Sequence, residues 1–186
     1  EIGSGLVGSE MCIRDRRYIL MKYTIRKEKK EDCMGVSHVI TVAWNETYKG
    51  ILSDSFLEEI KTNEVKRGKI IKETFATKNY RTLVLEIDNE VVGFVNFGKT
   101  EDLEFDNCGE IFALYIIKKY HHYGFGKKLV EESIKNLKEM GFDKMLISCL
   151  KENPTNEFYK HIGGRYIKNK IYKQLNLLEN VYYFDI

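Results

Sequence analysis

The strongest constraint on the fold is an apolar run that passes through a glycine-containing loop into an amphipathic helix. Residues 109–117, GEIFALYII, are apolar at nearly every position, which predicts a central strand buried on both faces. From Gly126 to Met140 the apolar residues recur at helical spacing, and Gly141 is well placed to end that helix. A buried strand that leads directly into such a helix is typical of an α/β domain, because the helix must cover one face of the sheet.

The rest of the chain supplies further strands and helices. Alternating or β-branched runs predict strands at residues 22–27, 81–87, 91–98, 144–150, 165–172 and 181–186. Helical spacing and capping residues predict helices from Asp32 to near Trp44, over residues 53–63 and over residues 154–162. We therefore expect one α/β domain over residues 21–186, with a mixed sheet of about seven strands flanked by about four helices.

Charge and cysteine content narrow the possible classes of protein. The chain has 186 residues and a formal net charge of +2, so a large basic surface for duplex nucleic acid is not expected. No apolar run reaches the roughly 18 residues of a membrane-spanning helix, so no membrane span is expected. The four cysteines are scattered without a CxxC pair, so neither a zinc site nor a redox pair is expected; they are Cys12, Cys33, Cys108 and Cys149. Scattered thiols in a chain of this size fit a reducing, cytoplasmic location.

The first twenty residues differ in character from the rest. The run EIGSGLVGSEMCIRDR resembles the translated sequencing adaptor that is sometimes fused to assembled reading frames, and Met21 then looks like the start. No basic segment precedes its apolar patch, so it makes a poor signal peptide. The alternative is a genuine disordered extension, since chain termini are often loose. We treat residues 1–20 as a non-native or disordered extension outside the domain.

The loop before the long helix has the features of an anion site. The first N–H groups of a helix have no partner within it and carry partial positive charge, and glycines such as Gly124 and Gly126 allow a ligand to approach the backbone. A dinucleotide-binding fingerprint is excluded because Leu129 stands in place of the third glycine. A P-loop is excluded because His121 and Lys128 stand at its glycine and hydroxyl positions. A plain helix-entry loop remains the alternative.

Three segments together resemble the GNAT superfamily of N-acetyltransferases. They are EIFALYIIKKYHHYGFGKKL, the downstream NPTNEFYKHIGG, and WNETYKGILSDSFL, which is similar to the first helical region of one bacterial branch. The resemblance covers Met21 to Ile186. It implies the GNAT (acyl-CoA N-acyltransferase) fold, acetyl-CoA as co-substrate without a metal, and direct acetyl transfer to a primary amine in a ternary complex. The sequence departs from the family pattern at His121, where Gln or Arg is usual, and at Lys118, where proline is usual.

The resemblance also implies a set of residues that bind acetyl-CoA. The pyrophosphate cradle would comprise Gly124 and Gly126 with the backbone amides of His122, Tyr123 and Lys127. The strand positions Leu114 and Ile116 would offer backbone groups to the thioester and the pantetheine arm, and Asn153 would bind the pantetheine amides.

Several of these residues have simpler readings. Leu114 and Ile116 are core side chains in either case, and Asn153 could cap a helix. His121 would either bind phosphate or close the loop. A metal site at His121 and His122 is not expected, because adjacent side chains diverge and no third ligand lies nearby in sequence.

Two residues are catalytic candidates by the same resemblance. Glu110 matches the general base of the histone-acetylating branch, and a partly buried carboxylate suits the removal of an amine proton. Tyr159 matches the tyrosine that protonates the departing CoA thiolate. The alternatives are a carboxylate satisfied at the end of a strand and an aromatic side chain in the core. Trp44 and Tyr48 could line the acceptor site or belong to the core.

Two further features are less specific. The acidic residues Asp102, Glu104 and Asp106 could attract a cationic acceptor or form an ordinary solvated loop. The final strand, VYYFDI, could pair across subunits, so both a monomer and a homodimer are possible.

Other functions compete with catalysis. One alternative is a catalytically idle acyl-CoA-binding or sensing module on the same fold. Another is a nucleic-acid-binding domain that uses Lys118, Lys119, Lys127 and Lys128, which the near-neutral charge disfavours. We expect an acetyltransferase with a small-molecule or peptide amine as acceptor, and no nucleic-acid or membrane partner.

Overall fold

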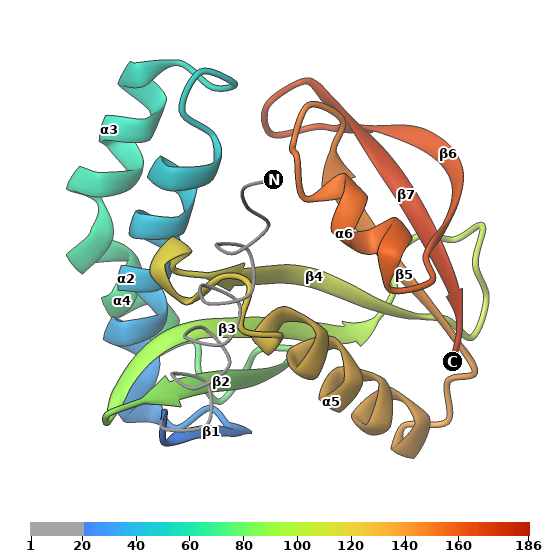
Figure 1. The fold of residues 1–186 in the computed structure, drawn as a ribbon, viewed down its shortest axis with the longest axis horizontal. Helices are drawn as coiled ribbons and strands as arrows, with labels where there is room; N and C mark the ends of the chain where they lie inside the picture. Colours follow the sequence, from blue (N-terminus) through green and yellow to red (C-terminus); the bar gives the residue numbers. More distant parts are fainter. Residues whose placement is uncertain (1–20) are drawn as a thin grey trace, which may run out of the picture.

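The structure is a computed structural model that describes residues 21–186. The interpretation of residues 1–20 as an extension lies outside the described residues. A single seven-stranded sheet has the strand order β1-β2-β3-β4-β5-β7-β6, which confirms the predicted sheet (Figure 1). The strands are β1 Tyr23–Lys27, β2 Arg81–Ile87, β3 Glu90–Lys99, β4 Gly109–Ile116, β5 Lys144–Leu150, β6 Arg165–Tyr172 and β7 Leu177–Asp185.

The sheet is mixed, as predicted. Within residues 21–186, β4 and β5 form the only parallel pair of strands, and the other neighbouring strands are antiparallel. A parallel pair needs a crossover connection, and the helix that follows the glycine loop provides it. The last strand, β7, lies between β5 and β6, so the suggestion that it pairs across subunits is wrong.

Helices cover both faces of the sheet (Figure 1). They are α2 Cys33–Thr47, α3 Asp54–Thr62, α4 Glu64–Glu73, α5 Phe125–Glu139 and α6 Asn156–His161, with 3₁₀ turns at Lys30–Asp32 and Lys118–Tyr120. The described residues thus hold five α-helices, one more than the expected four or so. The additional helix is α4, whose sequence EVKRGKIIKE is mostly charged and contains Gly68, so it has only a weak apolar stripe. Gly68 is buried against Met34 of α2, which explains how so polar a helix packs.

The prediction that the strand over residues 109–117 is buried on both faces is correct only for its first half. Gly109, Glu110 and Ile111 are buried, but the side chain of Phe112 is 43% exposed. Two causes act together. A β-bulge opposite Asn96 and Phe97 leaves Phe112 without a partner on β3, and the pairing with β5 ends at Ile111. Beyond this point β4 and β5 separate, so the outer half of β4 borders open space.

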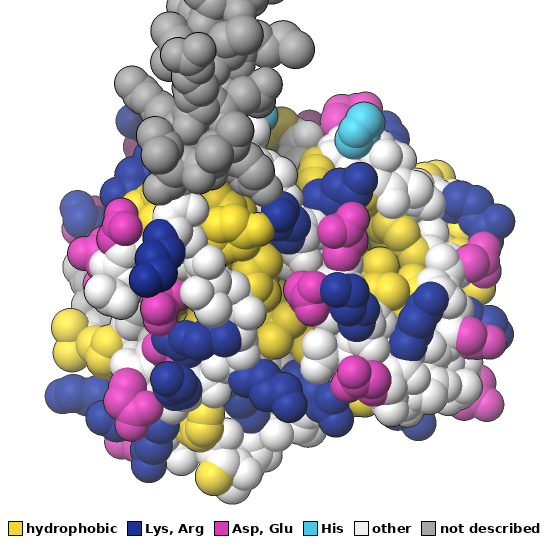
Figure 2. Space-filling model, turned by 60° about the horizontal axis from the view of Figure 1, so that its bottom comes forward, with side chains coloured by type: hydrophobic (Ala, Val, Ile, Leu, Met, Phe, Trp, Pro, Cys, Tyr) yellow, Lys and Arg dark blue, Asp and Glu magenta, His cyan; other side chains and the backbone are white. Residues whose placement is uncertain are grey.

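The surface gives no sign of a strongly basic face in the view from the lower side of Figure 1. Figure 2 shows Lys and Arg side chains interleaved with Asp and Glu, around patches of hydrophobic side chains. Among residues 21–186, no helix is both long and apolar enough to cross a lipid bilayer.

Candidate active site

A cavity of about 790 Å³ lies where β4 and β5 separate. Its walls come from α2, the outer half of β4, the loop before α5, the last residues of β5, α6 and the β6–β7 hairpin. The cavity therefore connects the start of α5 with the space between the two halves of the sheet. A second cavity of about 260 Å³ shares Trp44 and Tyr172 with the first and lies toward α3 and α4.

The loop that enters α5 has a conformation suited to an anion. Gly124 is the residue that precedes the helix, with φ of 77°, and His122 also has a positive φ of 65°. The first turn bond runs from the N–H of Lys128 to the carbonyl of Gly124, at 3.1 Å. By helix geometry, the N–H groups of Gly126 and Lys127 have no acceptor within the helix. These residues line the cavity, so the positive end of the helix dipole lies at its wall.

Gly126 has a different role from Gly124, because its lack of a side chain matters for packing and not for its backbone conformation. A Cβ atom there would lie 3.3 Å from the ring of Phe158 on α6, so the residue allows α5 and α6 to approach each other. Phe158 and Gly126 both line the cavity. Tyr123, in contrast, is not among the lining residues: its side chain packs on the core, with its ring centroid 6.1 Å from that of Phe125.

The two histidines of the loop make different contacts. The Nε2 atom of His121 lies 2.7 Å from the carbonyl oxygen of Ile116, so this side chain closes the loop onto the end of β4. A carboxylate of α2 also holds the loop, because the backbone N–H of Lys118 donates to Glu46 at 2.8 Å. Both histidines line the cavity. Among the described residues, no group of three or more His, Cys, Asp or Glu side chains is arranged to hold a metal ion.

Leu114, Ile116 and Asn153 all line the cavity. Leu114 and Ile116 also pack on the core, as expected in either case, and their backbone contacts with a cofactor stay a prediction. The side-chain oxygen Oδ1 of Asn153 accepts from the backbone N–H of Thr155 at 2.9 Å, which caps the turn before α6. Its amide nitrogen donates to the Tyr48 hydroxyl at 3.2 Å, which links this turn to the end of α2.

Tyr159 is buried and lies on the cavity wall. Loss of solvation raises the pKa of its phenol well above 10, and the neighbouring Cys149, Tyr48 and Tyr182 add to the effect. The phenol therefore keeps its proton at neutral pH. This is the state that a proton donor requires.

Glu110 has the environment of the alternative given above, a carboxylate satisfied at the end of a strand. It is buried, but it is not among the residues that line the cavity. The hydroxyl of Thr100 donates to one of its oxygens at 2.6 Å, and the Nζ of Lys170 lies 3.6 Å from the other. The acidic loop is also held in place, because Lys168 pairs with Asp102 and Glu104, and neither these two carboxylates nor Asp106 lines the cavity.

Sequence reasoning missed two carboxylates that line the cavity, Glu46 on α2, which holds the loop before α5, and Glu179 on β7. The predicted last strand began at Val181, whereas β7 begins at Leu177. The alternation of Leu177, Glu179 and Val181 was the available signal, because side chains two apart on a strand share a face.

Two polar atoms on the cavity wall lack partners. Within residues 21–186, the indole Nε1 of Trp44 and the hydroxyl of Ser148 are buried without a hydrogen bond, and no other buried side-chain nitrogen or oxygen is in this state. Buried polar groups in native proteins nearly always have a partner. Because both residues line the same cavity, a bound molecule can provide the missing partners.

Comparison with known proteins agrees with this geometry. The model of the acetyltransferase (GNAT) family matches residues 44–163, which run from the cavity-lining end of α2 through the loop before α5 to the end of α6. The chain belongs to this family. Membership indicates an acyltransferase activity.

Individual relatives of this GNAT protein are distant. An uncharacterized N-acetyltransferase of Bacillus subtilis, YuaI, is 24% identical over 140 residues, which cover 74% of this chain and 77% of the relative. The spermidine N(1)-acetyltransferase of Thermoplasma acidophilum is 29% identical over 147 residues, covering 77% and 88% of the two chains. Among solved structures, the PaiA N-acetyltransferase of Thermoplasma acidophilum in complex with coenzyme A has a TM-score of 0.70 at 23% identity, covering 86% and 98%.

Proposed function

We propose that the protein is an acetyl-CoA-dependent N-acetyltransferase that acts on a primary amine. The observation that carries this proposal is the continuity of the cavity, which joins the start of α5 to the gap between β4 and β5 and to the aromatic residues of α2. An extended cofactor with a phosphate group at one end and a thioester at the other fits such a path. Family membership and the relatives named above support the same reaction.

In this proposal the chain orients the cofactor by its backbone. The N–H groups at the start of α5 hold the pyrophosphate, and the loop closed by His121 fixes their direction. The pantetheine arm lies beside Leu114 and Ile116, where β4 has lost its partner strand. A backbone N–H near Leu114 would stabilise the oxyanion of the tetrahedral intermediate, and much of the rate enhancement would come from orientation.

The proton transfers involve two side chains. Tyr159, protonated and on the cavity wall, would give its proton to the departing thiolate. Glu110 would assist the deprotonation of the amine, and a water molecule or a second group must carry the proton because Glu110 does not line the cavity. Neither role requires a metal ion.

The acceptor is a small-molecule or peptide amine. The similarity to a spermidine N(1)-acetyltransferase supports a polyamine or another alkylamine as the first class to test. On the face that Figure 2 shows, Lys and Arg side chains are interleaved with Asp and Glu, so this face offers no continuous basic surface to a nucleic acid. The free thiols of Cys33, Cys108 and Cys149, all buried, support a reducing, cytoplasmic compartment. A monomer and a homodimer both remain compatible with the fold.

The test is an acetyl-CoA consumption assay with a broad panel of amines, including spermidine, diamines, amino sugars and peptides with free N-termini. We expect thiol release that depends on both substrates, and a ternary-complex kinetic pattern. Measurable CoA binding without consumption for any acceptor would favour the alternative, an idle acyl-CoA-binding module on the same fold. Salt-dependent binding to DNA or RNA would support the nucleic-acid alternative.

A further inference from the structure

We propose that Glu179 is the carboxylate that binds the ammonium group of the acceptor and takes its first proton. This inference rests on the proposed function and deepens it, because it assigns the acceptor side of the cavity to a residue of β7. It also specifies the acceptor as an amine that enters as a cation.

The position of Glu179 follows from the pairing of three strands. It lies opposite Lys170 on β6 and opposite Leu150 on β5. Side chains of directly paired residues share a face of the sheet. Glu179 therefore projects on the same side as Leu150, which packs with Tyr48 and borders the cavity. The side chain is half-buried, so it is reached through the cavity and is partly shielded from bulk water.

The charges around Glu179 favour a cation next to it. Loss of solvation raises the pKa of its carboxyl group, and the nearby Glu110 raises it further, whereas Lys170 lowers it. The other titratable groups that face it are Tyr48, Tyr172 and Cys149. Burial raises the pKa of each, and the charge of Glu179 raises it further. A carboxylate in this setting gains from a cation at its open side and has the raised pKa of a general base.

Aromatic rings complete the acceptor side. Trp44 has its ring centroid 5.0 Å from that of Tyr48 and 6.1 Å from that of Tyr115, and all three residues line the cavity with Tyr172. Aromatic faces attract alkylammonium groups. The unpartnered Ser148 hydroxyl belongs to the same wall and can accept an N–H of the amine or its hydrogen-bonded water.

Glu110 then acts indirectly, because it does not line the cavity. The Nζ of Lys170 lies 3.6 Å from Glu110, and the charges of Lys170 and Glu110 both act on Glu179, so Glu110 influences Glu179 through its own charge and through the lysine that it pairs with. This arrangement supplies the second group that the position of Glu110 requires. Glu110 is a positioning residue in this scheme, and Glu179 touches the substrate.

The protons balance with these assignments. The acceptor enters as an ammonium group with three protons on nitrogen, and the amide product keeps one of them. Two protons must therefore leave the nitrogen. The first passes to the Glu179 carboxylate, which frees the lone pair that forms the C–N bond. As the C–S bond breaks, Tyr159 protonates the sulfur, and the second nitrogen proton replaces the one that Tyr159 gave. Glu179 returns its proton to solvent after the product leaves.

The test compares Glu179→Gln with the wild-type protein in two assays. The first measures the binding of 1,4-diaminobutane to the protein–CoA complex by calorimetry, with 1,4-butanediol as an uncharged probe. The second measures kcat/KM for acetyl transfer across a range of pH. We expect the wild-type complex to bind the diamine. For Glu179→Gln we expect kcat/KM to fall roughly 100-fold and the acidic limb of the pH profile to disappear. CoA affinity should be unchanged. Asp185→Asn removes an exposed carboxylate of the same strand and should leave every readout unchanged.

The outcomes separate this proposal from the proposed function. Equal diamine binding and an unchanged pH profile in Glu179→Gln would overturn the assignment while turnover still supports the enzyme. No diamine binding to the wild-type CoA complex would also overturn it. Diamine binding that depends on Glu179 without any turnover would support the binding role and reject the acetyltransferase. Glu110→Gln should lower kcat/KM less than Glu179→Gln does and keep the diamine bound.

Discussion

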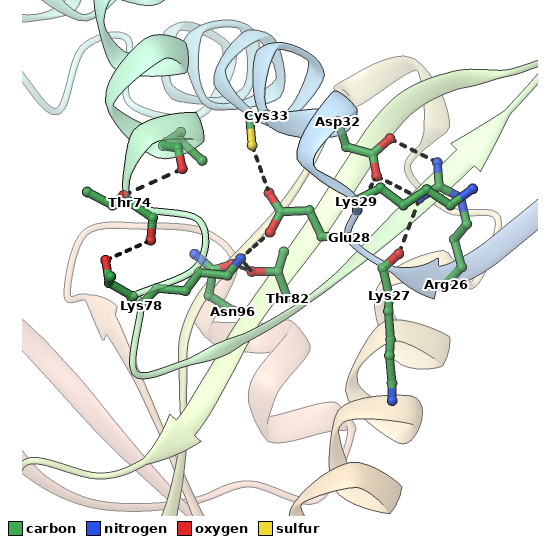
Figure 3. Close-up of polar contacts among 12 residues, drawn as sticks. Arg26, Lys27, Glu28, Lys29, Asp32, Cys33, Thr74, Lys78, Thr82 and Asn96 are labelled. Atoms are coloured by element: carbon green, nitrogen blue, oxygen red, sulfur yellow. Dashed lines mark hydrogen bonds and ion pairs between the residues drawn. The ribbon is translucent and has the colours of Figure 1, made fainter.

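Two polar regions in the interior of residues 21–186 differ in how fully their groups are paired. One is the β1 network, which consists of Arg26, Glu28, Asp32, Lys78, Thr82 and Asn96 at the end of β1 (Figure 3). The other is the wall of the cavity, where Trp44 and Ser148 have polar atoms without partners. A paired region holds elements of the fold together. An unpaired region of similar burial has polar groups available for a ligand.

Each charge in the β1 network meets a partner. Lys78 pairs with Glu28 and donates to the hydroxyl of Thr82 at 2.9 Å, and that hydroxyl donates to Asn96 at 2.9 Å (Figure 3). Arg26 bonds Asp32 at 2.6 Å, and this hydrogen bond lowers the pKa of the Asp32 carboxyl group. The network joins β1, the 3₁₀ turn before α2, β2, β3 and the segment after α4, so its loss should affect stability and not catalysis.

The largest effect is expected from Lys78→Met. Glu28 has a side chain only 2% exposed, so the substitution leaves a carboxylate buried without its cation. Breaking such a pair typically costs about 3–5 kcal/mol of unfolding free energy. Urea denaturation measures this loss, and CoA affinity of the folded fraction should stay the same. Lys135→Met is the matched control, because its pair with Glu132 is exposed and should contribute little. A loss of CoA affinity equal to the loss of stability would contradict the separation of the two regions.

The next effect is expected from Tyr159→Phe on the cavity wall. Loss of the proton donor should lower kcat roughly 100-fold, equivalent to about 2.7 kcal/mol in the barrier, with little change in acetyl-CoA affinity. Steady-state thiol release and calorimetry measure the two quantities. Tyr182→Phe is the control, because its hydroxyl donates to Asn156 at 2.8 Å and belongs to the structure. That variant should lose stability and keep kcat. Full activity of Tyr159→Phe would remove the acid role.

A smaller effect is expected from Gly124→Ala. The positive φ of Gly124 should make alanine cost about 1–2 kcal/mol of stability, although no atom blocks the added methyl group. Gly141→Ala is a matched control at the other end of α5, with φ of 91° and the same open surroundings. Thermal denaturation should show similar losses for both. Only Gly124→Ala should weaken CoA binding in a calorimetric titration, and equal CoA affinity in the two variants would argue against the cradle.

The smallest effect on stability is expected from Ser148→Ala. Its hydroxyl has no partner among the described residues, so its removal should change the unfolding free energy by about zero. Ser133→Ala removes a hydroxyl that donates to the carbonyl of Leu129 at 2.8 Å and should cost about 1 kcal/mol. Chemical denaturation compares the two serines, and diamine binding to the CoA complex should fall only for Ser148→Ala. A stability loss of the same size in both variants would show that Ser148 is satisfied in the free protein.

Most of the fold could be predicted from the sequence because local patterns and the overall topology agree. The run before Gly124, the stripe of α5 and the hairpin residues each indicate one kind of element. Helix α4 was missed because its burial depends on contact with α2 and not on its own apolar pattern. The exposure of Phe112 was missed because a bulge depends on the neighbouring strand.

The candidate site also contains residues that local motifs reveal and residues whose role depends on distant parts of the chain. Gly124 and Tyr159 could be recognised from local motifs, and both line the cavity. Glu110 also matched a motif, but its partners Thr100 and Lys170 come from distant parts of the chain and were invisible in sequence. Glu179 carries no motif, because its position depends on the register of three strands.

The parting of β4 and β5 also has a mechanical consequence. Three residue pairs, from Gly109–Met145 to Ile111–Ile147, join the two halves of the sheet directly. A molecule bound beyond these pairs would contact both β4 and β5 where the two strands no longer share hydrogen bonds, and would connect them there. The junction should therefore stiffen as the ligand concentration rises, by about RT ln(1 + [L]/Kd) in free energy. Amide hydrogen exchange in β5 and in the outer half of β4 would then report the fraction of the protein that has the ligand bound.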